Sequence, residues 1–366
     1  MAVYVLVDQD FMELALTLAE SAKGQTSPNP MVGAVVVKHG RIIGTGAHLK
    51  AGEAHAEVHA LNMAGDAARD ATIYVTLEPC SHYGRTPPCA ERIIASGIKR
   101  VVVAVVDSNP EVGGKGVKML QEAGIEVEVG ICEEQAKELN CAFFHYINKR
   151  QPYVTLKAAS SLDGKTATVA GQSKWITGDA ARADGHLLRH VNDAILVGVG
   201  TVLADNPSLT TRLPNGAGRH PLRVILDSQL RTPTDAQIVT DQMADTLIFT
   251  LKSASVEHEN HLKKSGVTII RLDRIDIQSV LNELGSREIQ TLLVEGGAEV
   301  HGSFVKEKSV NEVVQYIAPK LIGGRSASPV VGGEGIAQLN EVLQLSIKSV
   351  TQLGEDVRII SKVRRD

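Results

Sequence analysis

The chain of 366 residues lacks several features that mark whole classes of protein. Its longest nearly apolar stretch, 194–204, has only 11 residues and contains two glycines, so it is too short to cross a membrane. The N-terminus has no basic region before the short apolar stretch 2–7, so no secretory signal peptide is expected. We therefore expect a cytoplasmic protein.

Positive charge, aromatic residues and cysteines are also scarce. Lys and Arg number 38 against 42 Asp and Glu, a net charge of −4, and Phe, Tyr and Trp make up only 3% of the chain. This disfavours nucleic-acid binding, because phosphate contacts need cations and base stacking needs aromatic rings. The four cysteines are too few for a disulfide scaffold in so long a chain. They are expected to be metal ligands, reactive thiols or core residues.

The patterns that are present predict two α/β domains, as the length does at about 150 residues per domain. Residues 1–150 alternate helix and strand patterns, which predicts a three-layer α/β domain. Its predicted elements include strands at 32–38 and 41–47, joined by His39-Gly40, and one helix at 133–147. The polar stretch 148–152 marks the expected boundary. Residues 151–366 predict eight strands with fewer helices, in a mostly parallel sheet with an antiparallel C-terminal edge.

His55, Cys80 and Cys89 have the residue types of a catalytic zinc site. One imidazole and two thiolates leave the fourth tetrahedral position for water, whose pKa zinc lowers toward about 7. Glu57, at the start of a predicted helix, is the candidate that moves the proton. Nucleobase deaminases use this chemistry with closely spaced cysteines, whereas eight residues separate the two cysteines here. The alternatives are a structural zinc site or packed cysteines.

The second cysteine pair, Cys132 and Cys141, has the same spacing, but no histidine adjoins it in the helix pattern. We interpret these two as core or surface thiols.

Three segments of the first half resemble the bifunctional riboflavin-biosynthesis deaminase/reductase family. They are His55-Ala-Glu57, Pro79-Cys-Ser-His-Tyr-Gly-Arg-Thr-Pro-Pro-Cys89 and Ser27-Pro-Asn-Pro-Met-Val-Gly-Ala34. The resemblance implies a cytidine-deaminase-like domain at 1–150 with one Zn²⁺ per chain. Its reaction would be hydrolytic removal of the 2-amino group of 2,5-diamino-6-(5-phosphoribosylamino)pyrimidin-4-one. By the same resemblance, Asn29 and His48 contact substrate, and His82 and Arg85 meet its phosphate. The alternatives are that Asn29 shapes a turn and that Arg85 is a solvated charge.

In the second half, a strand pattern at 291–295 runs into Gly296-Gly297 and then a helix pattern from Ala298. Backbone amides and the helix dipole at such a junction can hold a phosphate, although the same pattern also forms plain turns. By itself the pattern predicts no more than a nucleotide-binding α/β domain.

The resemblance covers this half too, through motifs at 154–165, 173–177, 197–207, 294–297 and 318–323. It implies a dihydrofolate-reductase-like α/β domain at 151–366 that uses NADPH. Its reaction would reduce the ribosyl group of 5-amino-6-(5-phosphoribosylamino)uracil to ribityl. The residues expected to line NADPH are Ala159, Trp175, Thr201, Asp205, Ser228, Gly297, Ala298, Glu299, Val300, His301, Gly302 and Ser303. Those expected to hold substrate are Ser173, Leu209, Arg212 and Glu295.

Lys157, Asp163 and Glu295 are the ionisable candidates for proton transfer during reduction, and the sequence does not rank them. A plain turn is the alternative for Asp163, and core packing is the alternative for Trp175, the one tryptophan. A cation is expected to read the 2′-phosphate of NADPH, and both Arg231 and Lys252 are available.

The main alternative function is a transfer-RNA-type, nucleic-acid deaminase with a C-terminal binding domain, which the charge and the few aromatic residues disfavour. A second alternative is a zinc-stabilised interaction protein whose reductase domain has lost its activity. We expect a small-molecule phosphoribosylaminopyrimidine substrate, no nucleic-acid or membrane partner and, from the resemblance, a homo-oligomer.

Overall fold

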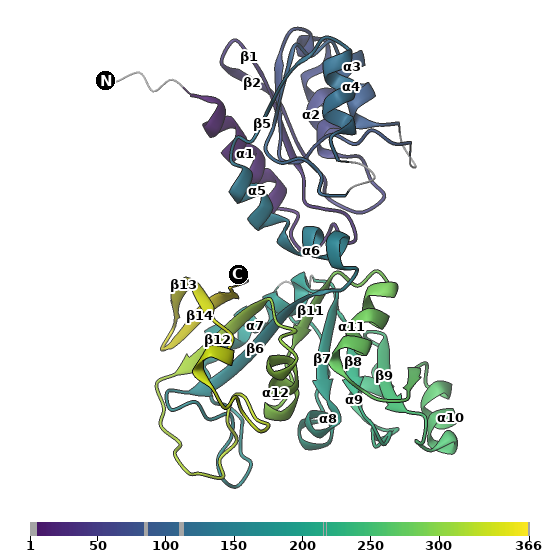
Figure 1. Cartoon of the computed structure of the whole chain (residues 1–366), viewed down its shortest axis with the longest axis vertical. Coiled ribbons are helices and arrows are strands. Elements are labelled where there is room, and N and C mark those ends of the chain that lie inside the picture. Colours follow the sequence, from purple (N-terminus) through teal and green to yellow (C-terminus); the bar gives the residue numbers. More distant parts are fainter. Residues whose placement is uncertain (1–5, 84–86, 110–112, 215, 217, 365–366) are drawn as a thin grey trace. The chain divides into compact units, whose positions relative to one another are not determined.

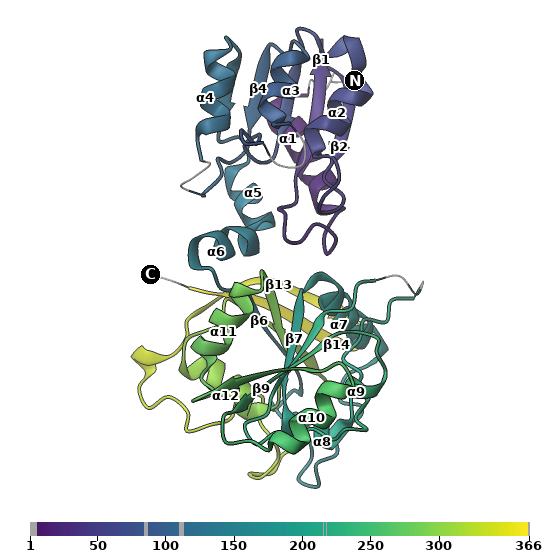
Figure 2. The ribbon, with the colours of Figure 1, turned by 90° about the vertical axis from the view of Figure 1, so that its right-hand side faces the viewer.

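The computed structural model describes residues 6–83, 87–109, 113–214, 216 and 218–364. The chain divides into two compact units, Met1–Arg150 and Gln151–Asp366, whose elements are shown in Figures 1 and 2. Within the described residues, no helix is both long and apolar enough to span a membrane.

The first unit is built on a five-stranded sheet with the strand order β2-β1-β3-β4-β5. β1 pairs antiparallel with β2 and β3, whereas β3, β4 and β5 run parallel to one another. The strands are β1 (Gly33–Lys38), β2 (Arg41–Ala47), β3 (Thr72–Val75), β4 (Arg100–Val103) and β5 (Glu126–Val129). The helices are α1 (Asp8–Glu20), α2 (Ala56–Ala64), η1 (Gly65–Ala68), α3 (Cys89–Ala95), α4 (Lys115–Glu122), α5 (Glu133–Leu139) and α6 (Cys141–Lys149).

Glycines in β1 and β2 let helices cover both faces of this sheet. A Cβ on Gly33 would lie 1.9 Å from the carbonyl oxygen of Ala15 in α1, and one on Gly44 would lie 2.2 Å from that of Ala60 in α2. Gly33 is directly opposite Ala47, so the two share a face, whereas Gly44 lies an odd number of residues from Ala47 and faces the other way. α1 and α2 therefore pack on opposite faces, which makes three layers.

The predicted hairpin and the predicted last helix had different outcomes. His39 and Gly40 join β1 to β2 with φ values of 51° and 72°, the left-handed conformations that tight hairpin turns need. The single helix predicted at 133–147 is wrong, because α5 and α6 are separate helices that meet at Asn140. The Asn140 side chain is buried and bonds both the N–H and the C=O of Met31, each at 2.8 Å. This tertiary bond, which helix periodicity does not reveal, holds the break in place.

The second unit has a nine-stranded sheet with the order β10-β9-β8-β7-β11-β6-β12-β14-β13. The strands are β6 (Tyr153–Ser161), β7 (Ala194–Gly198), β8 (Leu222–Leu226), β9 (Thr246–Leu251), β10 (Thr268–Leu272), β11 (Thr291–Val294), β12 (Glu312–Ala318), β13 (Leu345–Leu353) and β14 (Asp356–Val363). The helices are α7 (Asp179–Val191), α8 (Val199–Asp205), α9 (Gln237–Thr240), α10 (Val256–Lys264), α11 (Ile277–Ser286), α12 (Ala298–Lys306) and η2 (Leu339–Glu341).

The mostly parallel sheet with an antiparallel C-terminal edge agrees with the sequence prediction, since only the pairs β12–β14 and β14–β13 are antiparallel. The predicted count of eight strands is wrong, because β13 was missed. β13 is an edge strand with mixed polar and apolar residues and no buried one, so its sequence lacks an apolar run. α8, α9 and α10 were not predicted either; α10 is mostly charged and polar, and the other two are short.

Helices cover both faces of the larger sheet as well. Alternate residues of β7 illustrate this: Ala194 and Leu196 pack in the cluster that contains α11 and α12, whereas Ile195 and Val197 pack in the cluster that contains α8, α9 and α10. Figure 1 shows α12 beside the central strands of this unit. The central strands are therefore buried on both sides, as their β-branched and apolar runs predict.

We expect the Gly33→Ala substitution to destabilise the first unit, because the added methyl group would force α1 away from β1. Overpacking of this kind costs roughly 1–3 kcal/mol of unfolding free energy, which thermal denaturation of the full chain measures. An unchanged melting temperature for the first unit would show that α1 does not pack this closely on β1.

Candidate active sites

His55, Cys80 and Cys89 bring three metal-ligand atoms together in the first unit. Their donor atoms all lie within 4.8 Å of one another, with His55 Nδ1 at 3.2 Å from Cys89 Sγ and 3.7 Å from Cys80 Sγ. A tetrahedral zinc ion with bonds of about 2.0–2.3 Å requires nitrogen–sulfur separations of roughly 3.5 Å. The donor set and its spacing therefore fit zinc. Among the described residues, this is the one group of three or more His, Cys, Asp or Glu side chains with converging donor atoms.

Helix starts position these ligands. His55 is the N-cap of α2, with extended backbone angles, and Glu57 lies in the first turn. The N-cap lies outside the helical spiral, so two residues that would point apart within a helix can face one centre. Cys80 follows β3, and Cys89 begins α3. The Cys89 N–H donates to Cys80 Sγ at 3.2 Å, which fixes the two sulfur atoms relative to each other.

The ionisation of the side chains suits proton transfer beside a metal. Glu57 is only 3% exposed, and burial raises its pKa to about 7. A carboxyl group with such a pKa both accepts and releases a proton near neutral pH. A hydrogen bond from Cys89 and the nearby His55 lower the pKa of Cys80 below its ordinary value, whereas the hydrogen bond to Cys80 and burial raise the pKa of Cys89.

Two of the four expected substrate contacts lie together beside the metal ligands. The buried His48 bonds the Ala54 carbonyl through Nδ1 at 3.2 Å and the Asn29 side-chain nitrogen through Nε2 at 3.1 Å. Its ring centre lies 5.2 Å from that of His55. His82 is exposed on the loop between the cysteines, and Arg85 lies outside the described residues.

The other cysteine pair is not part of this cluster. Cys132 precedes α5 with a φ of 60°, and Cys141 begins α6, so each lies at a helix start. Both are half-buried, in keeping with their interpretation as packed thiols.

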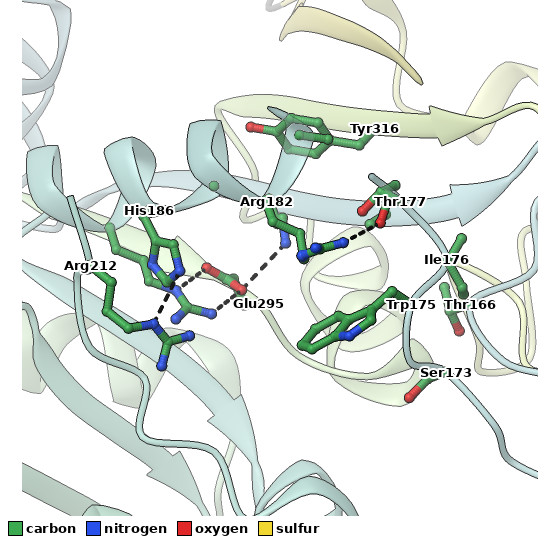
Figure 3. Close-up of a pocket in the computed structure, with 15 residues that line it drawn as sticks. Thr166, Ser173, Trp175, Ile176, Thr177, Arg182, His186, Arg212, Glu295 and Tyr316 are labelled. Atoms are coloured by element: carbon green, nitrogen blue, oxygen red, sulfur yellow. Dashed lines mark hydrogen bonds and ion pairs between the residues drawn. The ribbon is translucent and has the colours of Figure 1, made fainter. Parts of the chain in front are cut away.

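A cavity of about 410 Å³ opens in the second unit and collects many of the sequence-predicted reductase residues. Figure 3 shows it between α7 and the loop that carries Trp175. The residues from the sequence prediction that line it are Lys157, Ala159, Ser173, Trp175, Arg212 and Glu295. The alternative of core packing for Trp175 is wrong, because its side chain is 64% exposed.

Glu295 is the electrostatic centre of this cavity. It follows β11 and lies 2.8 Å from Arg189 Nε and 3.4 Å from Lys157 Nζ. Burial alone would raise the pKa of Glu295, but the charges of Arg189 and Lys157 outweigh it and hold this pKa well below its ordinary range. Glu295 is therefore a carboxylate at all physiological pH values.

Three lining residues missed by the sequence analysis lie on one face of α7. Arg182, His186 and Arg189 are spaced by four and then three residues, and all three line the cavity. Burial and the neighbouring Arg189 and Arg212 lower the pKa of His186 to about 4, so its ring is neutral at pH 7. A stripe of basic residues at helical spacing was the signal that could have revealed this face.

Glycines bring the N-terminus of α12 close to the strand ends. A Cβ on Gly296 would lie 2.5 Å from Val300, and one on Gly198 at the end of β7 would lie 2.9 Å from the same side chain. Gly297 and Gly200, by contrast, face space: a Cβ on Gly297 would meet nothing closer than Thr201 Oγ1 at 4.0 Å. Neither glycine is therefore packed against a neighbouring group at the position of its Cβ.

The other residues expected at the cofactor are spread along this edge of the sheet. Asp205 ends α8 and lies 3.6 Å from Lys174, and Ser228 is exposed after β8. In α12, Ala298, Glu299, Val300 and Ser303 follow the helix start, but the buried His301 bonds the Val330 carbonyl at 2.9 Å. A Cβ on Gly302 would meet the Gly332 carbonyl oxygen at 2.4 Å. His301 and Gly302 therefore pack against the 330–333 loop.

Asp163 and Leu209 do not line the cavity. Asp163 accepts hydrogen bonds from the Ser161 hydroxyl at 2.6 Å and from the N–H groups of Ile322 and Gly323, which lower its pKa to about 2. It thus joins the turn after β6 to the loop after β12. Leu209 is 3% exposed and packs in the core beside β7 and β8.

Comparison with known proteins identifies both halves of the chain. Residues 6–105 match the cytidine and deoxycytidylate deaminase zinc-binding region, and residues 152–359 match the RibD C-terminal domain. Riboflavin biosynthesis protein RibD of Bacillus amyloliquefaciens is 54% identical over 355 residues, which cover 96% of this chain and 95% of that protein. The chain belongs to the RibD family.

Solved RibD structures share the fold over nearly the whole length. Acinetobacter baumannii RibD, form 1, has a TM-score of 0.90 and 41% identity, covering 98% of this chain and 99% of that one. The diaminohydroxyphosphoribosylaminopyrimidine deaminase/5-amino-6-(5-phosphoribosylamino)uracil reductase of Thermotoga maritima has a TM-score of 0.87 and 38% identity, with coverages of 97% and 98%. As a RibD protein, the chain is a bifunctional enzyme of riboflavin biosynthesis, a zinc-dependent deaminase and a reductase. Its fold is a cytidine-deaminase-like domain followed by an α/β reductase domain.

We expect the metal to depend on one cysteine pair only. The parent RibD protein should contain about one zinc ion per chain. Cys89→Ser should lose most of this zinc and the deamination activity, because a thiolate ligand is lost. Cys132→Ser is the matched control and should keep both. Metal analysis of the purified full-length variants measures this, and loss of zinc from Cys132→Ser would contradict the assignment.

Trp175 offers a spectroscopic test of the reductase cavity, because it is the one tryptophan of the chain. The guanidinium of Arg182 lies over its ring at 4.6 Å (Figure 3), so Arg182→Ala should shift the emission to longer wavelength. Loss of an exposed cation–π contact costs about 0.5–1 kcal/mol of interaction free energy between the two side chains. Arg92→Ala, in the first unit, should leave the spectrum unchanged. Identical emission from both variants would show that Arg182 does not stack on the ring.

Proposed function

We propose that the chain catalyses two reactions on one type of substrate. Residues 1–150 deaminate 2,5-diamino-6-(5-phosphoribosylamino)pyrimidin-4-one by hydrolysis. Residues 151–366 then reduce the ribosyl group of 5-amino-6-(5-phosphoribosylamino)uracil to ribityl with NADPH. The observation that carries the proposal is that one chain holds both a His55, Cys80, Cys89 cluster beside a buried Glu57 and a charged cavity around Glu295. The Thermotoga relative that matches both units carries the name of both activities.

In the deaminase site, His55, Cys80 and Cys89 hold zinc, and Glu57 moves protons. Zinc in such a site supplies a water molecule of lowered pKa. With zinc bound, the buried Glu57 would accept a proton from the water as its oxygen bonds to the ring carbon. It would then donate a proton to the amino group as the carbon–nitrogen bond breaks and ammonia leaves.

His48 and Asn29 orient the pyrimidine. His48 donates its Nδ1 proton to the Ala54 carbonyl, so its Nε2 is the acceptor for the side-chain N–H of Asn29. The amide oxygen of Asn29 then remains for an N–H of the substrate. His82 and Arg85, on the loop between the cysteines, are proposed to meet the substrate phosphate.

In the reductase site, the cofactor and substrate meet at the 410 Å³ cavity. NADPH supplies the hydride. The open backbone at Gly297 and Gly200, beside Thr201, is proposed to hold its phosphates, with Trp175 and Ala159 nearer the reacting ring. The substrate side is proposed to comprise Ser173, Arg189, Arg212 and Glu295, whose arginine side chains suit a phosphate.

Lys157 is the proposed proton donor. Glu295 stays ionised between two cations, and Asp163 is occupied by hydrogen bonds outside the cavity lining. Lys157 faces the cavity, with Nζ 3.4 Å from Glu295, so it can give up a proton near the hydride path.

For the 2′-phosphate of NADPH, Arg231 is the better candidate. Lys252 is paired with Asp273 at 2.9 Å, whereas Arg231 is exposed and forms no ion pair among the described residues. The homo-oligomer and the cytoplasmic location expected from the sequence stay predictions.

The decisive experiment separates the two activities with Glu57→Gln. The variant should keep its zinc but lose roughly 10²–10⁴-fold in deamination rate, because the acid/base group is gone. Given the already deaminated substrate, it should still consume NADPH at nearly the parent rate, as followed by absorbance. A zinc chelator should mimic the variant in the parent enzyme. Equal loss of both activities in a folded, zinc-containing variant would refute the division of labour.

A further inference from the structure

Glu78 is a buried carboxylate two residues before the zinc ligand Cys80. It follows β3, and it is only 6% exposed. It forms no ion pair with any cationic side chain of the described residues. Burying an unpaired carboxylate is costly, so its environment must compensate for the lost water.

Four backbone N–H groups provide that compensation. Oε2 accepts from the N–H of Asp107 at 3.1 Å and of Gly114 at 2.9 Å. Oε1 accepts from the N–H of Gly116 at 2.8 Å and of Val117 at 3.1 Å. Three of these donors surround the N-terminus of α4, where the helix dipole adds to the stabilisation of negative charge. Both oxygen atoms are therefore fully used.

The same place shows close backbone packing. A Cβ on Gly116 would lie 2.0 Å from the carbonyl oxygen of Pro79 and 3.2 Å from Glu78 Cγ. The start of α4 thus contacts the peptide group that leads directly into Cys80. On its other side, the Glu78 N–H donates to the Val105 carbonyl at 2.9 Å, which joins the segment to the residues that follow β4.

We propose that Glu78 is a positioning residue of the deaminase site. By bonding the segment that follows β4 and the start of α4, its carboxylate sets the position from which Cys80 binds zinc. This inference rests on the proposed zinc-dependent deamination, but Glu78 itself touches neither metal nor substrate. Residues that hydrogen-bond a metal ligand directly typically contribute 10–100-fold to metal affinity, which is the scale against which the more indirect effect of Glu78 is measured.

Glu78→Gln tests the carboxylate at nearly constant shape. The side-chain amide has one oxygen, so its NH₂ group must face one of the two pairs of N–H donors, which lose their acceptor. We expect the full-length variant to bind zinc about 10-fold more weakly, the lower end of that scale, as measured by competition with a chromogenic chelator. The thiolate-to-metal absorption band of the cobalt(II)-substituted protein should shift as well. Reduction of the deaminated substrate should be unchanged.

Gly116→Ala tests the same contact without altering any charge. Its added methyl group must displace the Pro79 carbonyl, so we expect zinc affinity to fall although Glu78 is intact. If Glu78→Gln fails to fold, this variant decides the matter. Glu122→Gln, at the exposed end of the same helix, is the matched control and should bind zinc like the parent.

The outcomes distinguish this inference from the proposed function. If the parent binds zinc and Glu78→Gln has the zinc affinity and cobalt spectrum of the parent, the role of Glu78 alone is overturned. Where Glu78→Gln does not fold, the same result for Gly116→Ala overturns that role. A parent protein that binds no zinc would overturn the proposed deamination, and the inference with it. Restoration of deamination by excess zinc in Glu78→Gln would support a role in ligand placement, because Glu57 is unaffected.

Discussion

Parallel pairing of β3 with β4, and of β11 with β6 and β7, brings the carboxyl ends of these strands to one edge of each sheet. Loops and helix starts that follow such ends meet in space although they are far apart in sequence. In the first unit this edge gathers Glu78, Cys80 and Asp107, and in the second it gathers Glu295 and the start of α12. Both active sites depend on this constraint, because neither has its residues close together along the chain.

The two buried glutamates show how surroundings decide the chemistry of one residue type. Burial acts on both, and at Glu57 it outweighs the opposing charge of the nearby His55 and raises the pKa to about 7. Glu295 lies between Arg189 and Lys157, whose charges exceed the effect of burial and keep it ionised. The first can transfer protons near neutral pH, whereas the second serves as a fixed negative charge that orients two cations.

The sequence allowed the prediction of features that depend on local pattern or on an unusual motif. The strand runs at β6 to β12, the α12 start after Gly296-Gly297 and the metal cluster all belong to this class. Features set by tertiary contacts escaped prediction: Asn140 divides a continuous helix pattern through its bonds to Met31, and β13 is an edge strand with no apolar run. Arg189 was missed because a basic residue in an amphipathic helix is typical of a solvent-facing position. The helical spacing of its basic residues was a signal, but the fold is what shows that this face of α7 turns inward.

Val300 packs against the positions of two glycines, Gly198 at the end of β7 and Gly296, two residues after β11. One side chain of α12 thus fills the space that a β-carbon on either glycine would need. The three positions form a single steric unit, in which the volume at 300 limits what residues 198 and 296 can be. During divergence, a larger residue at either glycine is compatible with the helix only after position 300 has become smaller. The order in which such substitutions accumulate is therefore constrained, and the three positions should co-vary among descendants of this chain.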